Sequence, residues 1–287
     1  MKVGSITIVT PCRDAEKLIE RTAESIVAQT AVRSGRLQLQ YLVCDGASTD
    51  GTLDVVRRLC GSQVEIHSEK DGSMYEALAK GLRRATGDVV AYLNAGDFYS
   101  PTALDVVADV FEQTSAEWVT GLQVMYNESG QVIDAVLPHR YRSRLIQAGV
   151  YGGLLLPRHI QQESTFWRRS LQDEIDYQVL SRLKLAGDYY LWTRFARRAD
   201  LRLVQSYLGG FTYHVGQKSE ARGAYDGEVA SFTCRPTLGD RIHATWDAIT
   251  WHAAAIRSRA HHRSAIHYAL GAHRWTDDRS EDRRVPR

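Results

Sequence analysis

Three carboxylates follow segments that the sequence predicts to be strands. Asp97 ends the run Tyr92-Leu93-Asn94-Ala95-Gly96-Asp97, and its strand is the apolar segment 89–93. Asp45 and Asp71 hold comparable positions after earlier segments. Open α/β sheets bind ligands outside the carboxyl ends of their strands, and a carboxylate placed there can hold a divalent cation against a diphosphate. Taken singly, each is more often a turn or capping residue, but their recurrence at one edge favours a binding site.

The same edge contains candidate contacts for a nucleotide base. The loop Thr10-Pro11-Cys12-Arg13 follows the first predicted strand, and Asp45 follows the second. A carboxylate can accept a hydrogen bond from a base N–H, such as N3 of uracil, and would discriminate against bases that lack this donor. Guanine also offers N–H donors, so the sequence favours uracil without excluding guanine.

The elements that position these residues alternate in type. Apolar strand segments are expected at 5–10, 39–44, 64–67, 88–93 and 118–126, with amphipathic helices between them. This alternation predicts a doubly wound, mostly parallel sheet with helices on both faces. Two capping signals mark the starts of predicted helices. They are Asp14 before the first helix, and the capping box Ser73–Glu76 before the helix that starts near residue 74.

The second half of the chain is less regular. A strand is expected at 207–213, helices rich in His and Arg from residue 236, and a disordered charged tail at 276–287. We therefore expect a domain over 1–235, made of a nucleotide-binding half (1–126) and an acceptor-binding half (127–235). A helical extension would follow over 236–275.

Composition limits the class of protein. Among 287 residues, 44% are hydrophobic and 24% charged, with a net charge of +2, which is ordinary for a soluble domain and gives no reason to expect nucleic acid. The four cysteines lack metal-type or Cys-x-x-Cys spacing and fit a reducing compartment. There is no signal-peptide pattern and no apolar run near the roughly 18 residues of a membrane span. We expect a cytoplasmic protein.

Six motifs, in order over residues 5–220, resemble those of family-2 glycosyltransferases with a GT-A fold, of the bacterial type that builds surface polysaccharides. They are Val9-Thr10-Pro11-Cys12-Arg13-Asp14; Val43 to Thr52, with Asp45-Gly46-Ala47-Ser48; Leu93-Asn94-Ala95-Gly96-Asp97; Gln162-Glu163-Ser164-Thr165-Phe166-Trp167-Arg168-Arg169; Gly187-Asp188-Tyr189-Tyr190-Leu191-Trp192; and Phe211 to Ser219.

The resemblance implies an inverting transfer of one sugar from a nucleotide-diphosphate sugar to a hydroxyl of a glycan or lipid-linked acceptor. In that reaction Mg²⁺ or Mn²⁺ neutralises the departing diphosphate while a base deprotonates the acceptor. It implies Asp188 as the base and Asp97 as the metal ligand, with His214 a weaker metal candidate. The implied nucleotide contacts are Thr10, Pro11, Cys12, Arg13, Asp45, Asp71, Asn94, Ala95 and Gly96. Gln162, Glu163 and Trp167 would face the sugar or acceptor.

The chain departs from the family pattern at four places. Gly96 replaces the first of two adjacent acidic residues in the metal signature, Asp14 replaces an Asn, and Gly187 stands where an acidic residue often precedes the base. The polymerising synthases carry Gln-x-x-Arg-Trp, whereas here Gly271 occupies the Gln position before Arg274-Trp275. This last departure favours a single addition over processive synthesis.

Several alternatives stay open on the sequence alone. His214 could equally be a structural histidine. The Trp- and Arg-rich segment near 246–263 could lie on an anionic membrane, as a peripheral contact at the inner face, or pack on the core. A sugar nucleotidyltransferase would need a Gly-rich basic loop that residues 5–16 lack. A non-catalytic binding module would not need both Asp97 and Asp188.

Overall fold

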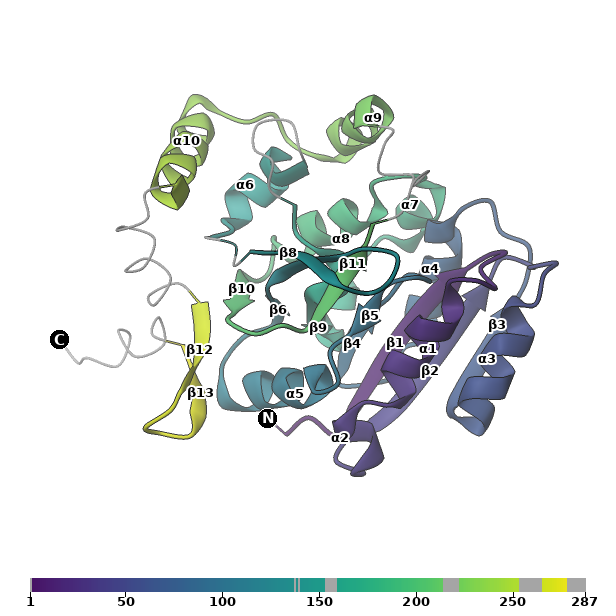
Figure 1. The fold of residues 1–287 in the computed structure, drawn as a ribbon. Helices are drawn as coiled ribbons and strands as arrows, with labels where there is room; N and C mark the ends of the chain where they lie inside the picture. Colours follow the sequence, from purple (N-terminus) through teal and green to yellow (C-terminus); the bar gives the residue numbers. More distant parts are fainter. Residues whose placement is uncertain are drawn as a thin grey trace.

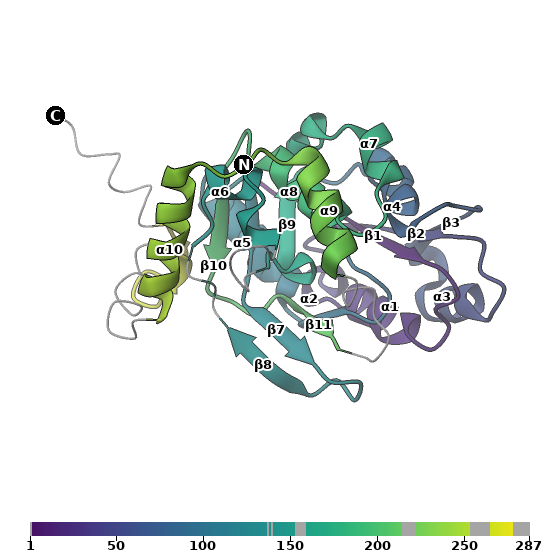
Figure 2. The same ribbon diagram turned by 90° about the horizontal axis from the view of Figure 1, so that it is seen from above.

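The computed structural model describes residues 2–136, 138, 140–152, 159–213, 222–252 and 265–277. Its main sheet has the strand order β13-β12-β10-β6-β9-β4-β1-β2-β3. β9 runs antiparallel to both of its neighbours and β13 runs antiparallel to β12, while the other pairs are parallel. A smaller sheet, ordered β5-β11-β7-β8, lies beside it on the side of α1 (Figures 1 and 2).

The strands are short. β1, β2, β3, β4, β6, β7 and β11 overlap the predicted strand segments, whereas β5, β8, β9, β10, β12 and β13 were not predicted. Their bounds are β1 Ser5–Cys12, β2 Gln38–Asp45, β3 Val64–Ser68, β4 Val89–Tyr92, β5 Phe98–Tyr99, β6 Trp118–Thr120, β7 Gln123–Tyr126, β8 Val132–Val136, β9 Thr165–Arg168, β10 Leu201–Val204, β11 Gly209–Thr212, β12 Ala265–Ala269 and β13 Arg274–Thr276. The expected strand 118–126 is split into β6 and β7, which belong to different sheets.

Helices cover both faces of the main sheet, with α1 and α3 on one side and α4, α7 and α8 on the other (Figure 2). Their bounds are α1 Ile19–Val27, α2 Thr30–Arg33, α3 Thr52–Cys60, α4 Met74–Arg84, α5 Ala103–Gln113, α6 Ser143–Gln147, α7 Tyr177–Arg182, α8 Gly187–Phe195, α9 Arg222–Phe232 and α10 Leu238–His252, with short 3-10 turns at Gly61–Gln63, Val150–Gly152, Gln162–Ser164 and Arg169–Glu174. This is the expected α/β architecture.

The two capping predictions have different outcomes. The Ser73 Oγ accepts from the Glu76 N–H at 3.2 Å, as the capping box predicts, and the Glu76 carboxylate accepts from the Gly72 N–H at 2.8 Å. The prediction for Asp14 is wrong, because α1 begins at Ile19 without a side-chain cap. Asp14 instead has a left-handed φ of 46° and accepts from the Thr49 N–H at 2.9 Å.

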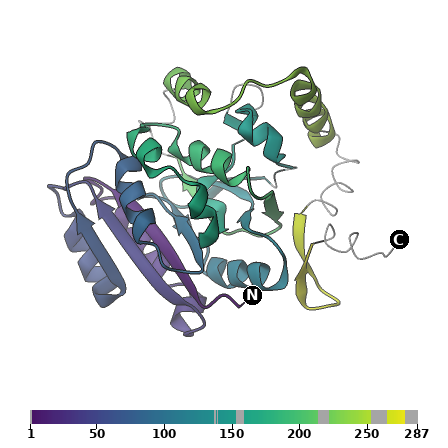
Figure 3. The same cartoon turned by 180° about the vertical axis from the view of Figure 1, so that it is seen from behind.

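The end of the chain corrects the expectation of a purely helical extension. Residues 238–252 are helical, but 265–269 and 274–276 form the hairpin β12–β13 at the edge of the main sheet far from β3 (Figure 3). Ala265 and Ile266 are buried there because β12 pairs with β10. The expected tail also starts too early, since Thr276 lies in β13 and the buried Asp277 pairs with Arg202. Residues 278–287 lie outside the described part.

Candidate active site

The ends of β1, β2 and β3 are aligned by strand register. Cys12 is paired with Asp45, and Asp45 with Ser68, so three loops leave the sheet at one level. Gly46 lies between two of the predicted residues: a side chain there would come within 2.6 Å of the Asp71 carboxylate and 3.2 Å of Arg13. The structure therefore brings Arg13, Asp45 and Asp71 together, as the sequence predicted.

Asp45 is the most enclosed of these carboxylates, with 1% of its surface exposed. It accepts hydrogen bonds from the Ser48 N–H at 3.0 Å, from the Ser48 hydroxyl, and from the Ser68 hydroxyl at 2.6 Å. A carboxylate offers about four lone-pair positions, so a base N–H that reaches Asp45 has to compete with these donors. Asp71 is more open, and its pKa is raised by burial and by the nearby Glu76.

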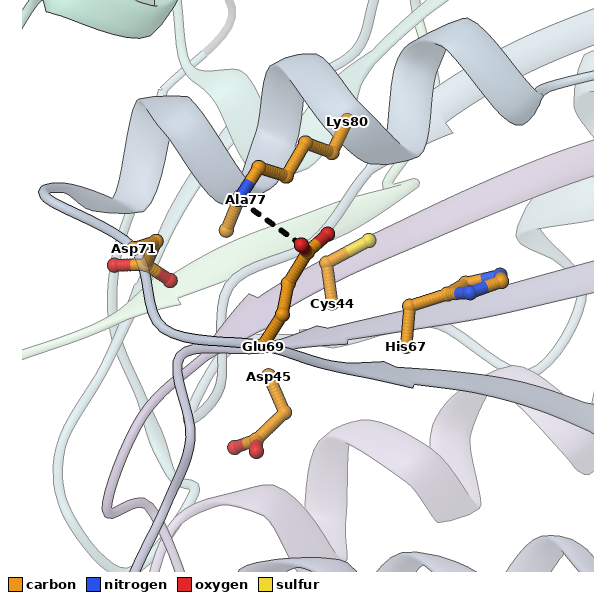
Figure 4. A pocket seen from close by; sticks show the side chains of 7 residues that line it. All are labelled: Cys44, Asp45, His67, Glu69, Asp71, Ala77 and Lys80. Carbon is orange, nitrogen blue, oxygen red and sulfur yellow. Dashed lines mark ion pairs between the residues drawn. The ribbon is translucent and has the colours of Figure 1, made fainter.

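A small cavity lies between β2, β3 and α4, and Figure 4 shows the side chains around it. Its volume is about 10 Å³, which is room for one water and not for a base. Lys80 of α4 pairs with Glu69 at 3.6 Å and with Glu76 at 3.2 Å. The lining residues are Cys44, Asp45, His67, Glu69, Asp71, Ala77 and Lys80.

Three of the four residues expected in the first loop, Thr10, Pro11 and Cys12, lie instead at the end of β1. Thr10, Pro11 and Cys12 are buried, and the Arg13 side chain is 57% exposed and pairs with Asp14. Burial, followed by the charge of Asp45, raises the pKa of the Cys12 thiol far above its usual value. Because the thiolate is the nucleophilic form, the raised pKa makes Cys12 a poor nucleophile.

The segment after β4 is held by hydrogen bonds from two other elements. Thr22 of α1 accepts from the Gly96 N–H at 2.9 Å and donates to the Asp97 carbonyl at 2.7 Å. Thr212 of β11 donates its N–H to the Asp97 carboxylate at 2.8 Å and its hydroxyl to the Gly96 carbonyl at 2.7 Å. Gly96 has φ +107°, which only glycine adopts without strain, and this explains why the expected acidic residue is absent there.

Asp97, Glu163 and Asp188 form a group of carboxyls behind this segment. Burial, followed by the charge of the neighbouring Glu163, raises the pKa of Asp97 well above its usual value. Burial and the charge of Asp188 raise the pKa of Glu163 to about 7. Burial raises the pKa of Asp188 to about 6, and the charge of Glu228 adds to this. Carboxyl groups whose pKa values are strongly shifted by burial and by neighbouring charges are typical of catalytic sites.

Of the motif expected to face the acceptor, residues 162–169, only Glu163 belongs to this group of three carboxyls. Gln162 donates to the Tyr92 carbonyl and accepts from the Asn94 side chain at 3.2 Å, so it ties the start of β9 to the end of β4. Trp167 does not fit its predicted acceptor contact. It is fully buried in β9 and packs on Trp192 and Phe195, with ring centroids 6.0 and 5.3 Å away.

The base candidate Asp188 lies in the first turn of α8, and Tyr75 fixes its surroundings. The Tyr75 hydroxyl donates to the Leu185 carbonyl at 2.9 Å. A side chain at Gly187 would meet the Tyr75 ring at 2.3 Å, so the acidic residue expected before the base has no room.

Glu228 of α9 is a site residue that the sequence analysis missed. Its carboxylate accepts from the Lys184 and Leu185 N–H groups at 2.7 Å and from the Ala186 N–H at 2.6 Å. These three donors directly precede Gly187 and Asp188. Glu228 lies 40 residues after Asp188 in a helix of mixed composition, and no local signal links the two.

The side chains around Asp97 indicate whether the predicted metal ion could bind there. Within the described ranges, no three His, Cys, Asp or Glu side chains are arranged to hold an ion by themselves, and His214 lies outside those ranges. Asp97 supplies a carboxylate at the end of β4, and Mg²⁺ commonly takes one or two protein carboxylates and completes its shell with substrate phosphates and water. The residues present fit a cation that the nucleotide diphosphate helps to bind.

Comparison with known families decides the class of this protein. The family model described as "Glycosyl transferase family 2" matches residues 7–175, which is more than half of the chain and includes Asp45, Asp97 and Glu163. The chain belongs to glycosyl transferase family 2. The match confirms the resemblance drawn from the motifs.

Curated relatives of this glycosyltransferase are distant. A PGL/p-HBAD biosynthesis glycosyltransferase of Mycobacterium tuberculosis is 27% identical over 176 residues, 60% of this chain and 62% of the relative. The hyaluronan synthase of Pasteurella multocida is 28% identical over 112 residues, 38% of this chain and 11% of the synthase. The chain therefore spans less than two thirds of either relative's length.

Solved structures support the fold. S. aureus TarS 1–349, crystallised with UDP-GlcNAc, matches with a TM-score of 0.58 at 16% identity, over 91% of this chain and 69% of that one. The mannosyltransferase PcManGT from Pyrobaculum calidifontis, in complex with GDP-Man and Mn²⁺, matches with a TM-score of 0.54 at 19% identity, over 91% and 74%. The sheet of this glycosyltransferase is thus of the GT-A type.

Proposed function

We propose that this glycosyltransferase transfers one sugar from a nucleotide-diphosphate sugar to a hydroxyl of a glycan or lipid-linked acceptor, with inversion at the anomeric carbon. The proposal is carried by the carboxyls Asp97, Glu163 and Asp188. Asp97 follows β4, and Arg13, Asp45 and Asp71 stand at or after the carboxyl ends of its parallel neighbours β1, β2 and β3. Asp97 and the carboxyls near it suit a diphosphate with its cation, whereas Arg13, Asp45 and Asp71 suit a nucleoside.

In this proposal Asp97 holds Mg²⁺ or Mn²⁺ together with the donor diphosphate. When bound, the cation neutralises the charge that develops on the leaving nucleoside diphosphate. The Thr212 N–H, which donates to Asp97 at 2.8 Å, would orient that carboxylate, and the charge of Glu163 acts on it. PcManGT, a structural neighbour, was solved with Mn²⁺, which supports the choice of metal.

Asp188 is proposed as the general base. Its carboxylate takes the proton of the acceptor hydroxyl while the hydroxyl oxygen attacks the anomeric carbon from the face opposite the diphosphate. The new C–O bond forms as the bond to the diphosphate oxygen breaks, and this single displacement inverts the configuration. A positioned base contributes about 10²–10⁴-fold to such a reaction.

For the nucleoside we propose contacts to the base and ribose from Asp71 and Asp45, with Thr10, Pro11, Cys12 and Arg13 as the wall. Asn94, Ala95 and Gly96 would pass the ribose and phosphates. A uracil nucleotide is favoured, and a guanine nucleotide is the alternative. The titles of the neighbours name both kinds of donor, UDP-GlcNAc and GDP-Man.

We further propose a single addition to a cell-envelope acceptor. Arg274 and Trp275 lie in the edge hairpin β12–β13, apart from α8 (Figure 1), which supports the view that they are not the terminal motif of a polymerising synthase. None of the described helices is long and apolar enough to cross a membrane. A lipid-linked acceptor would therefore be met by a peripheral enzyme at the inner face of the membrane.

A thermal-shift panel tests the donor site. UDP, GDP, CMP and dTDP are each added with and without Mn²⁺, and a ligand at about 100 times its Kd should stabilise the fold by about 2.7 kcal/mol. We expect one nucleotide to raise Tm in a metal-dependent way. Asp97→Asn should lose the metal-dependent part, whereas Asp54→Asn, at an 87% exposed side chain on α3, should keep it. Stabilisation by no nucleotide would contradict the proposed donor site.

A further inference from the structure

Helix α10 is fixed to the body of the protein by its two acidic residues. Asp247 is 1% exposed and accepts two hydrogen bonds from the Arg142 guanidinium, at 2.7 and 2.8 Å. Asp240 is 4% exposed and pairs with Arg144 at 3.0 Å. The inward face of α10 is therefore polar and neutralised. This is the reverse of the usual surface helix, which turns its apolar stripe inward.

The outward face of α10 consists of large apolar side chains. Leu238, Ile242, Trp246 and Ile249 are 76%, 60%, 60% and 56% exposed. Their spacing of four, four and three residues places them in one stripe along the helix. Together with Arg241 and Thr245, the last three line a hollow of about 310 Å³. A contiguous exposed apolar patch of this kind marks an interaction surface.

Over residues 238–250 of α10, the exposed ionisable side chains are all basic. Both acidic residues of the helix are the buried ones, whereas Arg241 and His243 are exposed. In the sequence, the segment 253–264 that follows contains no acidic residue and adds Arg257, Arg259 and Arg263. Apolar residues flanked by cations complement an anionic lipid surface, and tryptophan is favoured at the headgroup level.

A second copy of the chain fits this face less well. In a twofold pair each patch meets the same patch of its partner, so Arg241 would be brought toward Arg241 without an acidic residue of α10 to neutralise it. Figures 1 and 2 show α10 at one end of the molecule, with β2 and β3 at the other.

We propose that α10 docks this protein on anionic membranes, with Leu238, Ile242, Trp246 and Ile249 inserted among the lipid headgroups and Arg241 paired with lipid phosphates. The docking itself is independent of the transferase reaction. Its use in meeting a lipid-linked acceptor rests on the proposed function.

Co-sedimentation of the full chain with lipid vesicles tests this proposal without any nucleotide sugar. One set of vesicles contains phosphatidylcholine alone, and the other contains phosphatidylcholine mixed with phosphatidylglycerol. We expect binding to the mixed vesicles, strongly reduced at high salt. Ile242→Ser with Trp246→Ser should weaken binding about tenfold or more, because it removes two large apolar side chains. Arg241→Glu should weaken it as well.

The matched control is a second exposed apolar pair. Val132 and Ile133 of β8 are 55% and 53% exposed, and their replacement by Ser should leave vesicle binding unchanged. Because all of these residues are exposed, the variants should keep the Tm of the parent. Equal sedimentation with both vesicle types, or full binding by the α10 variant, would overturn the proposal. So would a dimer in solution that the α10 variant abolishes while the parent ignores vesicles.

Discussion

At the residue scale, the carboxyl group of Asp188 should set the pH dependence of the reaction. Its pKa is raised to about 6, chiefly by burial, and only the deprotonated form accepts a proton. We expect kcat/KM to rise with pH through about 6 and then to level off. Asp188→Asn should lower kcat about 10²–10⁴-fold while nucleotide binding, measured by thermal shift, is retained. An unchanged rate in this variant would remove Asp188 as the base.

Glu163 should reduce stability in the absence of metal. Burial and Asp188 raise its pKa from 4.5 to about 7, so in the folded protein it keeps its proton to higher pH than in the unfolded chain. Protonated Glu163 therefore contributes to the free energy of unfolding at low pH, and this contribution is lost as the pH rises through about 7. One pKa unit corresponds to about 1.36 kcal/mol, so the loss is at most about 3 kcal/mol.

Glu163→Gln tests this loss in buffer that contains EDTA. The amide has no charge, so Tm at pH 8 should exceed that of the parent by a few degrees. At pH 5 the two Tm values should converge. The rate of sugar transfer should fall in the same variant, because side chains that a functional site needs often lower the stability of the fold. A Tm difference that does not vary with pH would contradict the raised pKa of Glu163.

At the scale of elements, α9 should position the base through Glu228. Three N–H groups before α8 donate to this carboxylate at 2.6–2.7 Å, and its charge also raises the pKa of Asp188. Glu228→Ala removes all three acceptors and should lower kcat about tenfold or more, as part of the contribution of a positioned base. Glu228→Gln keeps one acceptor oxygen and should lose less.

The pH profile separates positioning from general damage to the fold. Without the Glu228 charge, the pKa of Asp188 should fall, so the acidic limb of kcat/KM should move to lower pH in Glu228→Gln. Asp226→Asn changes a carboxylate on the same helix that makes none of these three hydrogen bonds, and it should keep the parent profile. If the Glu228 variants lose only Tm, with kcat and the pH limb unchanged, Glu228 has a structural role alone.

The elements also show how far the sequence can predict this protein. Local patterns were sufficient for the strands that end at Asp45 and Tyr92 and for the capping box at Ser73, because apolar runs and capping residues act within a few positions. They failed for Asp14, whose carboxylate bonds a loop 35 residues away, and for Glu228, for the same reason. Trp167 was misplaced because a core aromatic and a pocket aromatic look alike in sequence.

At the scale of the whole molecule, the hairpin β12–β13 completes the main sheet at an edge where prediction gave helices. The segment is short and rich in Ala and His, so its strand character comes from pairing with β10 and not from local preference. The Trp275 N–H donates to the Gln113 side chain of α5 at 2.6 Å. Arg202 of β10 and Asp277 form an ion pair with side chains only 12% and 2% exposed.

Removal of this hairpin should destabilise the whole domain. A chain that ends at Ser264 exposes the edge of β10 and leaves Arg202 without Asp277, and the loss of one partner from a buried ion pair costs about 3–5 kcal/mol. We expect a lower Tm by thermal unfolding and association through the open edge, seen by light scattering. A chain that ends at Asp277 retains every contact described here and serves as the control. If the two chains have equal Tm values, the hairpin lies on the sheet without stabilising it, and the domain ends before residue 265.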